Sequence, residues 1–101
     1  MIENAMRPIH PGEILREEYL IPLGLSANAL ARALSITAAR VNEIVRERRG
    51  VTGDTALRLA RYFGTDAQSW LNLQAIYDLR VAGIEAGKLI ENQVRPRARA
   101  A

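Results

Sequence analysis

The chain has no cysteine and only one histidine, His10, among its 101 residues. Without cysteine there can be no disulfide and no cysteine-ligated metal site, so we expect neither a metal nor a cofactor. No apolar run approaches the roughly 20 residues needed to cross a bilayer. The N-terminal residues also lack the apolar segment of a secretory signal. We therefore expect a cytoplasmic protein that does not associate with membranes.

The sequence also lacks a recognisable catalytic constellation, which requires a nucleophile or base with an orienting partner. His10 stands alone before a proline, and the carboxylates Glu13, Glu17 and Glu18 read as the exposed face of a first helix. We therefore predict that the protein is not an enzyme and has no small-molecule substrate.

Aromatic residues make up only 5% of the chain, whereas hydrophobic residues make up 49%. The core must therefore be aliphatic and rich in alanine, which suits packed helices. The length fits one domain plus tails. We predict an all-α fold of five helices.

The positive charge comes almost entirely from arginine, because Lys88 is the only lysine. Fourteen Lys and Arg residues against eleven Asp and Glu residues give a net charge of +3. Arginine forms bidentate bonds to phosphates and base edges, so this balance points mildly towards nucleic acid. A charge of this size is also common among ordinary soluble proteins.

Start and stop signals delimit the first three expected helices. Pro11 fits the first turn of a helix that ends by Gly24. Ser26 is placed to cap a second helix over residues 27–34, and Thr37 a third over residues 38–48. We expect Gly50 to close the third helix.

Two more helices are expected after this point. The fourth runs from Thr52 to Gly64, and the fifth begins after Thr65 or Asp66. Glycines at positions 83 and 87 should weaken the fifth helix. We therefore expect only a short helical extension beyond it, followed by a basic tail.

The stretch 25–49 combines two helices with almost nothing between them. Ala31 stands where the helices would approach most closely, Ser35 stands at the turn, and Val41 and Ile44 belong to the inward stripe of the second helix. Small, turn-forming and aliphatic residues at these positions are what a DNA-binding helix-turn-helix requires. We predict that the second helix of the pair is a recognition helix.

The outer face of that helix carries residues able to read bases. At about 100° per residue, the residues on this face or its flank are Ala38, Ala39, Arg40, Asn42, Glu43 and Arg46. Arginine can take guanine, asparagine adenine and glutamate the amino group of cytosine, while alanine methyls can touch thymine.

Candidate phosphate contacts flank this face. They are Arg48, Arg49 and the backbone amides near Thr37 and Thr52. At the first helical position of the pair, where phage repressors with this motif often have a bracing glutamine, this chain has Ala27, so Ser26 or Asn28 would have to substitute. A second interpretation stays open, in which the charged residues only pair with one another on a solvated helix, and Arg48 only caps it.

The fifth helix carries an apolar band wider than a small bundle needs. Trp70, Leu73, Ile76 and Tyr77 belong either to the core or to a dimer or partner surface, with Arg80 at the rim. A palindromic DNA site would require self-association, which favours a homodimer.

With these residues identified, three segments carry a more specific resemblance. RPIHPGEILREEYLIPLGLS, ERRGVTGDTALRLARYFGT and SWLNLQAIYDL resemble the HigA-type antitoxins of bacterial toxin–antitoxin modules, a branch of the phage-repressor-like (XRE) helix-turn-helix class. The resemblance covers about three-quarters of the chain.

This resemblance implies a compact five-helix phage-repressor-like domain that forms a homodimer through its C-terminal region. It also implies binding to an inverted-repeat operator on double-stranded DNA in its own promoter. The implied partner is an mRNA-cleaving toxin of the RelE/HigB-like ribonuclease class. A free-standing transcriptional regulator without a toxin is the alternative.

We accordingly divide the chain into three parts. Residues 1–7 form a flexible arm in which Met6 is an alternative start to Met1. Residues 8–82 form the helix-turn-helix DNA-binding and dimerisation domain, and residues 83–101 form a C-terminal extension with a basic tail.

Overall fold

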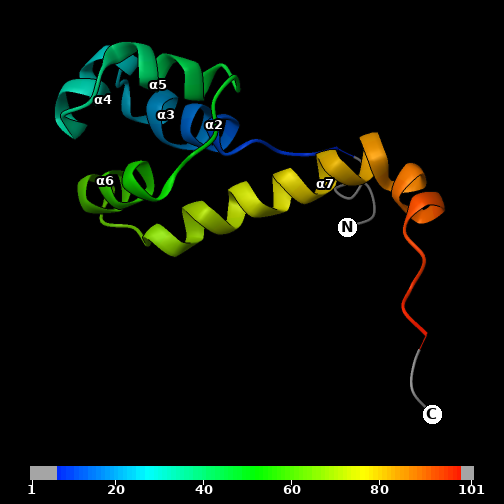
Figure 1. Ribbon diagram of the computed structural model, residues 1–101. Coiled ribbons are helices and arrows are strands. Elements are labelled where there is room, and N and C mark those ends of the chain that lie inside the picture. Colours follow the sequence, from blue (N-terminus) through cyan, green and yellow to red (C-terminus); the bar gives the residue numbers. More distant parts are fainter. Residues whose placement is uncertain (1–6, 99–101) are drawn as a thin grey trace.

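The computed structural model describes residues 7–98, and all secondary structure in this range is helical (Figure 1). The expected all-α architecture is confirmed. If the continuous first segment is counted as one helix, the described residues form the five predicted helices. Nearly all of the expected N-terminal arm, including Met1 and Met6, and the last three residues of the basic tail lie outside the described range.

The first helical segment is continuous from α2 (Pro11–Ile14) through the π-helical η1 (Leu15–Leu20) to α3 (Ile21–Leu23). It begins as predicted, because Pro11 occupies the first turn and lacks only a backbone donor that would be unpaired there anyway. Its cap is His10, whose Nδ1 accepts a hydrogen bond of 2.8 Å from the Gly12 amide. Gly24 ends the segment in the left-handed region, at φ 61°.

Helices α4 (Ala27–Leu34) and α5 (Ala38–Val45) form the predicted pair, with the expected caps. The Ser26 hydroxyl accepts from the Ala29 amide at 3.0 Å, and the Thr37 hydroxyl accepts from the Arg40 amide at 3.1 Å. The expected end of α5 was wrong. The chain reverses at Glu47, with φ 64°, and not at Gly50.

Contacts from the first helix explain why α5 ends early. Arg16 donates to the carbonyl of Val45, which would otherwise be one of the unpaired acceptors at the helix C-terminus. Its guanidinium also lies 3.4 Å from the Glu47 carboxylate. The left-handed Glu47 is therefore held by a partner 31 positions away in sequence.

Helix α6 (Gly53–Phe63) is capped by Thr52 and ended by Gly64, as predicted. Helix α7 (Ala67–Gln93) is capped by Asp66, and it continues through both glycines that were expected to weaken it. That expectation was wrong, because each glycine costs only about 1 kcal/mol relative to alanine and most of their neighbours are good helix formers. The helix axis changes direction towards its C-terminal end, but the helix is not interrupted (Figure 1).

The core lies where the first helix, α4, α5, α6 and the start of α7 meet. Its most deeply buried large side chains include Leu15, Leu30, Ile44 and Leu59. Trp70 belongs to this core with 3% exposure, and it packs on Tyr19 at a ring separation of 5.4 Å. Of the two alternatives for Trp70, the core is therefore the correct one and the partner surface is not, because its ring is already covered within the chain.

The distal part of α7 projects beyond the core. The described chain measures 57 × 27 × 25 Å and has a radius of gyration of 17.0 Å, against about 13 Å for a compact domain of this length. Figure 1 shows the yellow and orange parts of the helix leaving the bundle. The start of α7 therefore completes the core, while its second half has few neighbours.

Candidate nucleic-acid interface

The turn between α4 and α5 has the backbone that a helix-turn-helix needs. Ser35 adopts φ 58° and ψ 45°, a left-handed conformation usually occupied by glycine. The Ile36 amide donates back to the Ala31 carbonyl at 3.0 Å, closing the end of α4. Ala31 itself is 2% exposed, as a small residue between two packed helices should be.

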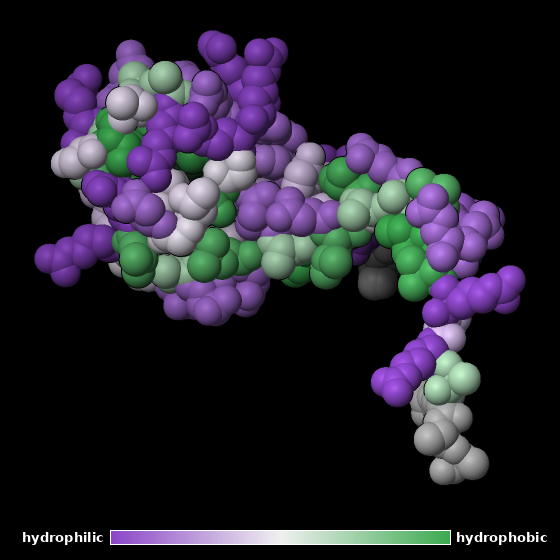
Figure 2. All heavy atoms as spheres, viewed as in Figure 1, coloured by the Kyte–Doolittle hydropathy of each residue, from purple (hydrophilic) through white to green (hydrophobic). Residues whose placement is uncertain are grey.

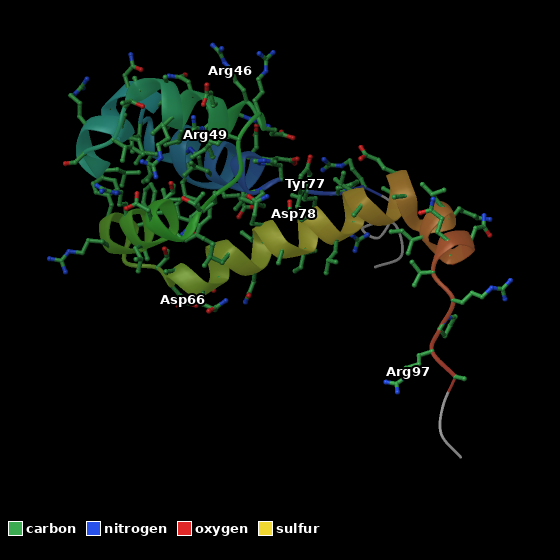
Figure 3. The ribbon with its side chains drawn as sticks, viewed as in Figure 1. Arg46, Arg49, Asp66, Tyr77, Asp78 and Arg97 are labelled. Carbon is green, nitrogen blue, oxygen red and sulfur yellow. The ribbon has the colours of Figure 1, made fainter. Side chains whose placement is uncertain are left out.

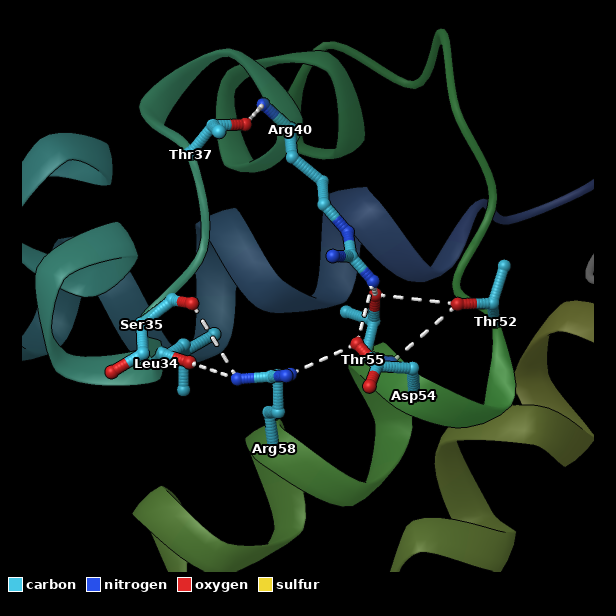
Figure 4. A network of polar contacts seen from close by, with 8 residues as sticks. All are labelled: Leu34, Ser35, Thr37, Arg40, Thr52, Asp54, Thr55 and Arg58. Atoms are coloured by element: carbon cyan, nitrogen blue, oxygen red, sulfur yellow. Dashed lines mark hydrogen bonds and ion pairs between the residues drawn. The ribbon is translucent and has the colours of Figure 1, made fainter.

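Helix α6 stabilises this turn through Arg58. Its Nη1 donates to the Leu34 carbonyl at 2.8 Å and lies 3.5 Å from the Ser35 carbonyl (Figure 4). These carbonyls end α4, where the helix dipole favours a cation. Sequence reasoning missed this role of Arg58, because no local pattern links residues 24 positions apart.

The outer face of α5 and the loop after it form one shallow hollow. The residues lining it are Ala39, Asn42, Glu43, Arg46, Arg48 and Arg49. All six were predicted as DNA contacts from their helical spacing or their charge. Figure 3 shows Arg46 pointing away from the helical body into solvent. The structure therefore brings most of the predicted contacts together on one exposed surface.

Arg40 lies apart from this hollow. Its Nη2 donates to the Asp54 carboxylate at 2.8 Å and to the buried Thr55 hydroxyl at 2.9 Å (Figure 4). Only 26% of its side chain is exposed. Of the two arginines considered for guanine, Arg46 is thus the one available on the outer face.

Asn42 connects the two helices of the motif. Its Nδ2 donates to the Ala38 carbonyl at 2.8 Å and lies 3.4 Å from the Asn28 side-chain oxygen. Asn28 therefore contacts the recognition helix, as a bracing residue would. Ser26, the other candidate, uses its hydroxyl to cap α4.

Some of the charged residues do pair with one another, as the alternative interpretation expected. Glu43 accepts from Arg49 at 2.7 Å, with roughly half of each side chain exposed. Such exposed pairs contribute little to stability, so a phosphate can displace the carboxylate at low cost. Within residues 7–98, no ion pair involves Arg46 or Arg48.

Two ionisable groups near the interface have shifted pKa values. Hydrogen bonds from Arg58 and then Arg40 lower the pKa of Asp54 below its usual value, which keeps the carboxylate ionised. Burial lowers the pKa of His10, because the charged imidazolium loses its solvation there.

The predicted dimer surface on α7 is only partly buried. Leu73 is half-buried against the core, whereas Ile76 is 56% exposed. Tyr77 packs edge-on against His10 at 4.8 Å. Leu73 and Ile76 line a second hollow together with Arg7, Ile9, Ile14 and Arg80.

The continuous α7 also exposes large apolar residues that sequence analysis had not assigned to a partner surface. They are exposed to between 49% and 74%: Leu79, Ile84, Leu89 and Ile90. Figure 2 shows hydrophobic colour along the helix and at its projecting end. We did not assign these residues to a partner surface from the sequence because we expected the helix to weaken at Gly83.

The part of the chain that the structure describes holds no cluster of three or more His, Cys, Asp or Glu residues arranged for a metal ion. No helix between residues 7 and 98 is both long enough and apolar enough to cross a membrane.

Comparison with known proteins agrees with this geometry. The sequence pattern of the helix-turn-helix family matches residues 15–70. Virulence-associated protein I of Dichelobacter nodosus is 70% identical over 80 residues, which cover 79% of this chain and 74% of that protein.

Two solved structures are similar over most of their length. The Pseudomonas aeruginosa antitoxin HigA, solved with the higBA promoter, has a TM-score of 0.88 and 54% identity, covering 91% of this chain and all of that one. The antitoxin GraA in complex with its operator has a TM-score of 0.87 and 50% identity, covering 92% and 94%.

Proposed function

The chain belongs to the HigA-type antitoxins of the helix-turn-helix family, and from that premise we propose that it binds an operator in its own promoter and represses transcription. This is a family of DNA-binding proteins and not of enzymes. The observation that carries the proposal is the exposed hollow on α5, where six predicted DNA contacts meet. We expect the protein to act in the cytoplasm, where its operator lies.

Within that hollow, the proposed roles divide by position. Asn42 and Arg46 have the donors to read base edges in the major groove. Arg46 is the C-cap of α5 and its amide still bonds the Asn42 carbonyl, whereas Arg48 and Arg49 lie beyond the left-handed Glu47. We assign these two residues to the phosphate backbone, where they contribute affinity without sequence information.

The proposed operator is an inverted repeat, which a homodimer would read with two copies of α5. The exposed apolar residues of α7 support this assembly. From Ile76 to its projecting end, the helix exposes several large apolar side chains, and exposed apolar surface on a soluble protein commonly marks an interaction site. A second α7 would cover part of it.

We further propose that the protein neutralises a toxin of the RelE/HigB-like ribonuclease class. Support comes from the HigA-type relatives, which are named as antitoxins. The test is to express the chain with the product of the neighbouring reading frame and measure co-purification and mRNA cleavage. If the two products neither associate nor affect each other, the protein is a free-standing regulator.

Operator binding is tested separately by footprinting the promoter DNA upstream of the gene. We expect protection of two half-sites about one helical turn, or a multiple of it, apart. Affinity should fall steeply with salt, since several arginines release counterions from phosphate. Uniform protection of all sequences would contradict a sequence-specific repressor.

A further inference from the structure

Helix α6 contacts both halves of the helix-turn-helix through a polar network in which Asp54 bonds Arg40 of α5 and also Arg58, the residue that contacts the end of α4. The Asp54 Oδ2 accepts from Arg40 of α5 at 2.8 Å and from Arg58 of α6 at 2.9 Å. Arg58 in turn holds the carbonyls that end α4. Figure 4 shows these contacts as one connected network.

The network fixes two parts of the motif whose local sequence leaves them weakly determined. Ser35 lies in a left-handed conformation that costs a non-glycine residue energy. The first turn of α5 has, as its local restraint, the Thr37 cap. Through Arg58 the carboxylate reaches the turn, and through Arg40 it reaches the start of the recognition helix.

We propose that Asp54 is a positioning residue for operator recognition, a role that rests on the proposed DNA binding. It links two parts of the motif to α6: the connection between α4 and α5, and the N-terminal end of α5. The outer face of α5 then meets the major groove in one orientation. Asp54 itself carries the same charge sign as DNA and gains nothing from contact with phosphate. Its contribution is therefore to selectivity between sequences.

Three features support a positioning role over a role in overall stability. The Asp54 side chain is 54% exposed, and that of Arg58 is 39% exposed, so ion pairing between them contributes little to folding. The Arg40 guanidinium also donates to the buried Thr55 hydroxyl, and this second contact restrains the rotation of α5 about its own axis. None of these groups lines the hollow that faces the DNA.

The test compares Asp54→Asn with Glu18→Gln in the full chain. Glu18 is an exposed carboxylate of η1, so both variants remove one negative charge. Dissociation constants are measured for a duplex footprinted in the upstream promoter and for a scrambled duplex of equal composition. Thermal unfolding of every variant verifies that the fold is retained at the temperature of the binding assay.

We expect Asp54→Asn to reduce the ratio of the two affinities about tenfold, the loss typical of one misplaced base contact. Glu18→Gln should leave that ratio unchanged. In an Arg40→Met background, Asp54→Asn should cause a smaller further loss, because part of its route to α5 is already removed.

Two results would overturn the proposal. Equal tightening on both duplexes would mean that Asp54 acts only by repelling phosphate. An unchanged ratio in a folded Asp54→Asn protein would mean that the network has no role in recognition. If the unaltered protein fails to distinguish the two duplexes, the proposed operator binding itself fails, and that outcome is visible before any variant is made.

Discussion

Gly12 of the first helix lies directly against the carbonyl oxygen of Ile44 in the recognition helix. A Cβ added at Gly12 would lie 1.8 Å from that oxygen. The close approach brings the start of α2 against the end of α5, beside the point where Arg16 bonds the Val45 carbonyl. The orientation of α5 thus depends on a residue that lies outside the helix-turn-helix itself.

Gly12→Ala should therefore destabilise the fold strongly. The added methyl group meets backbone that cannot move without shifting α5, so we expect a loss of about 3 kcal/mol or more. The matched control is Gly53→Ala in the first turn of α6, where an added Cβ meets nothing within 4 Å. Urea unfolding of both variants measures the difference, and equal midpoints would contradict the close contact.

Ser35→Gly should stabilise the protein, even though glycine usually destabilises. The left-handed backbone at this position is strained for serine but not for glycine, so we expect a gain of up to about 1 kcal/mol. Ala33→Gly, two residues earlier in the exposed part of α4, should instead lose about 1 kcal/mol. Thermal unfolding separates the two cases, and a loss at Ser35 as large as that at Ala33 would show that strain is absent.

The sequence predicted the local features of this fold but not those that depend on distant residues. The caps, the turn at Ser35 and the outward face of α5 follow from local spacing, and they were identified correctly. The reversal at Glu47 and the hydrogen bond from Arg58 to the end of α4 depend on contacts between residues far apart in sequence. Hydrophobic periodicity carries no information about such contacts. The two glycines of α7 misled because propensity is a weak local term that the neighbouring residues outweighed.

Acidification should destabilise the protein through His10. Burial lowers the pKa of His10 from its usual 6.5, so the unfolded chain binds a proton more readily than the folded one. Its contribution is present above pH 6.5 and is lost as pH falls towards the folded pKa. Protonation would also occupy the Nδ1 atom that accepts from Gly12.

The check is to compare unfolding midpoints of the unaltered chain and His10→Asn between pH 7 and about 5.5, above the range where carboxylates titrate. Asparagine keeps a capping oxygen but does not titrate. We expect the unaltered chain to lose stability over this range and the variant to lose less. Parallel pH profiles would show that His10 is not the group responsible.

Charge placed on the exposed apolar residues of α7 should prevent self-association. Leu79 is 74% exposed and Ile84 is 64% exposed, so Leu79→Asp with Ile84→Asp leaves the core intact while opposing apolar burial. Asn72→Asp adds a charge to an exposed position of the same helix and serves as the control. Analytical ultracentrifugation should give a monomer for the double variant and a dimer for the control. A dimer in both would place the interface elsewhere.

Arg46 and Arg48 should differ in how they contribute to DNA binding. Arg46 points outward from the end of α5 (Figure 3), so Arg46→Ala should cost about 1–3 kcal/mol on the operator and little on scrambled DNA. Arg48→Ala should weaken both duplexes by similar factors and reduce the salt slope by about one unit. Titrations at several salt concentrations measure both effects. If Arg46→Ala weakens every duplex equally, its role is limited to phosphate, and base reading must come from Asn42 and its neighbours in the hollow.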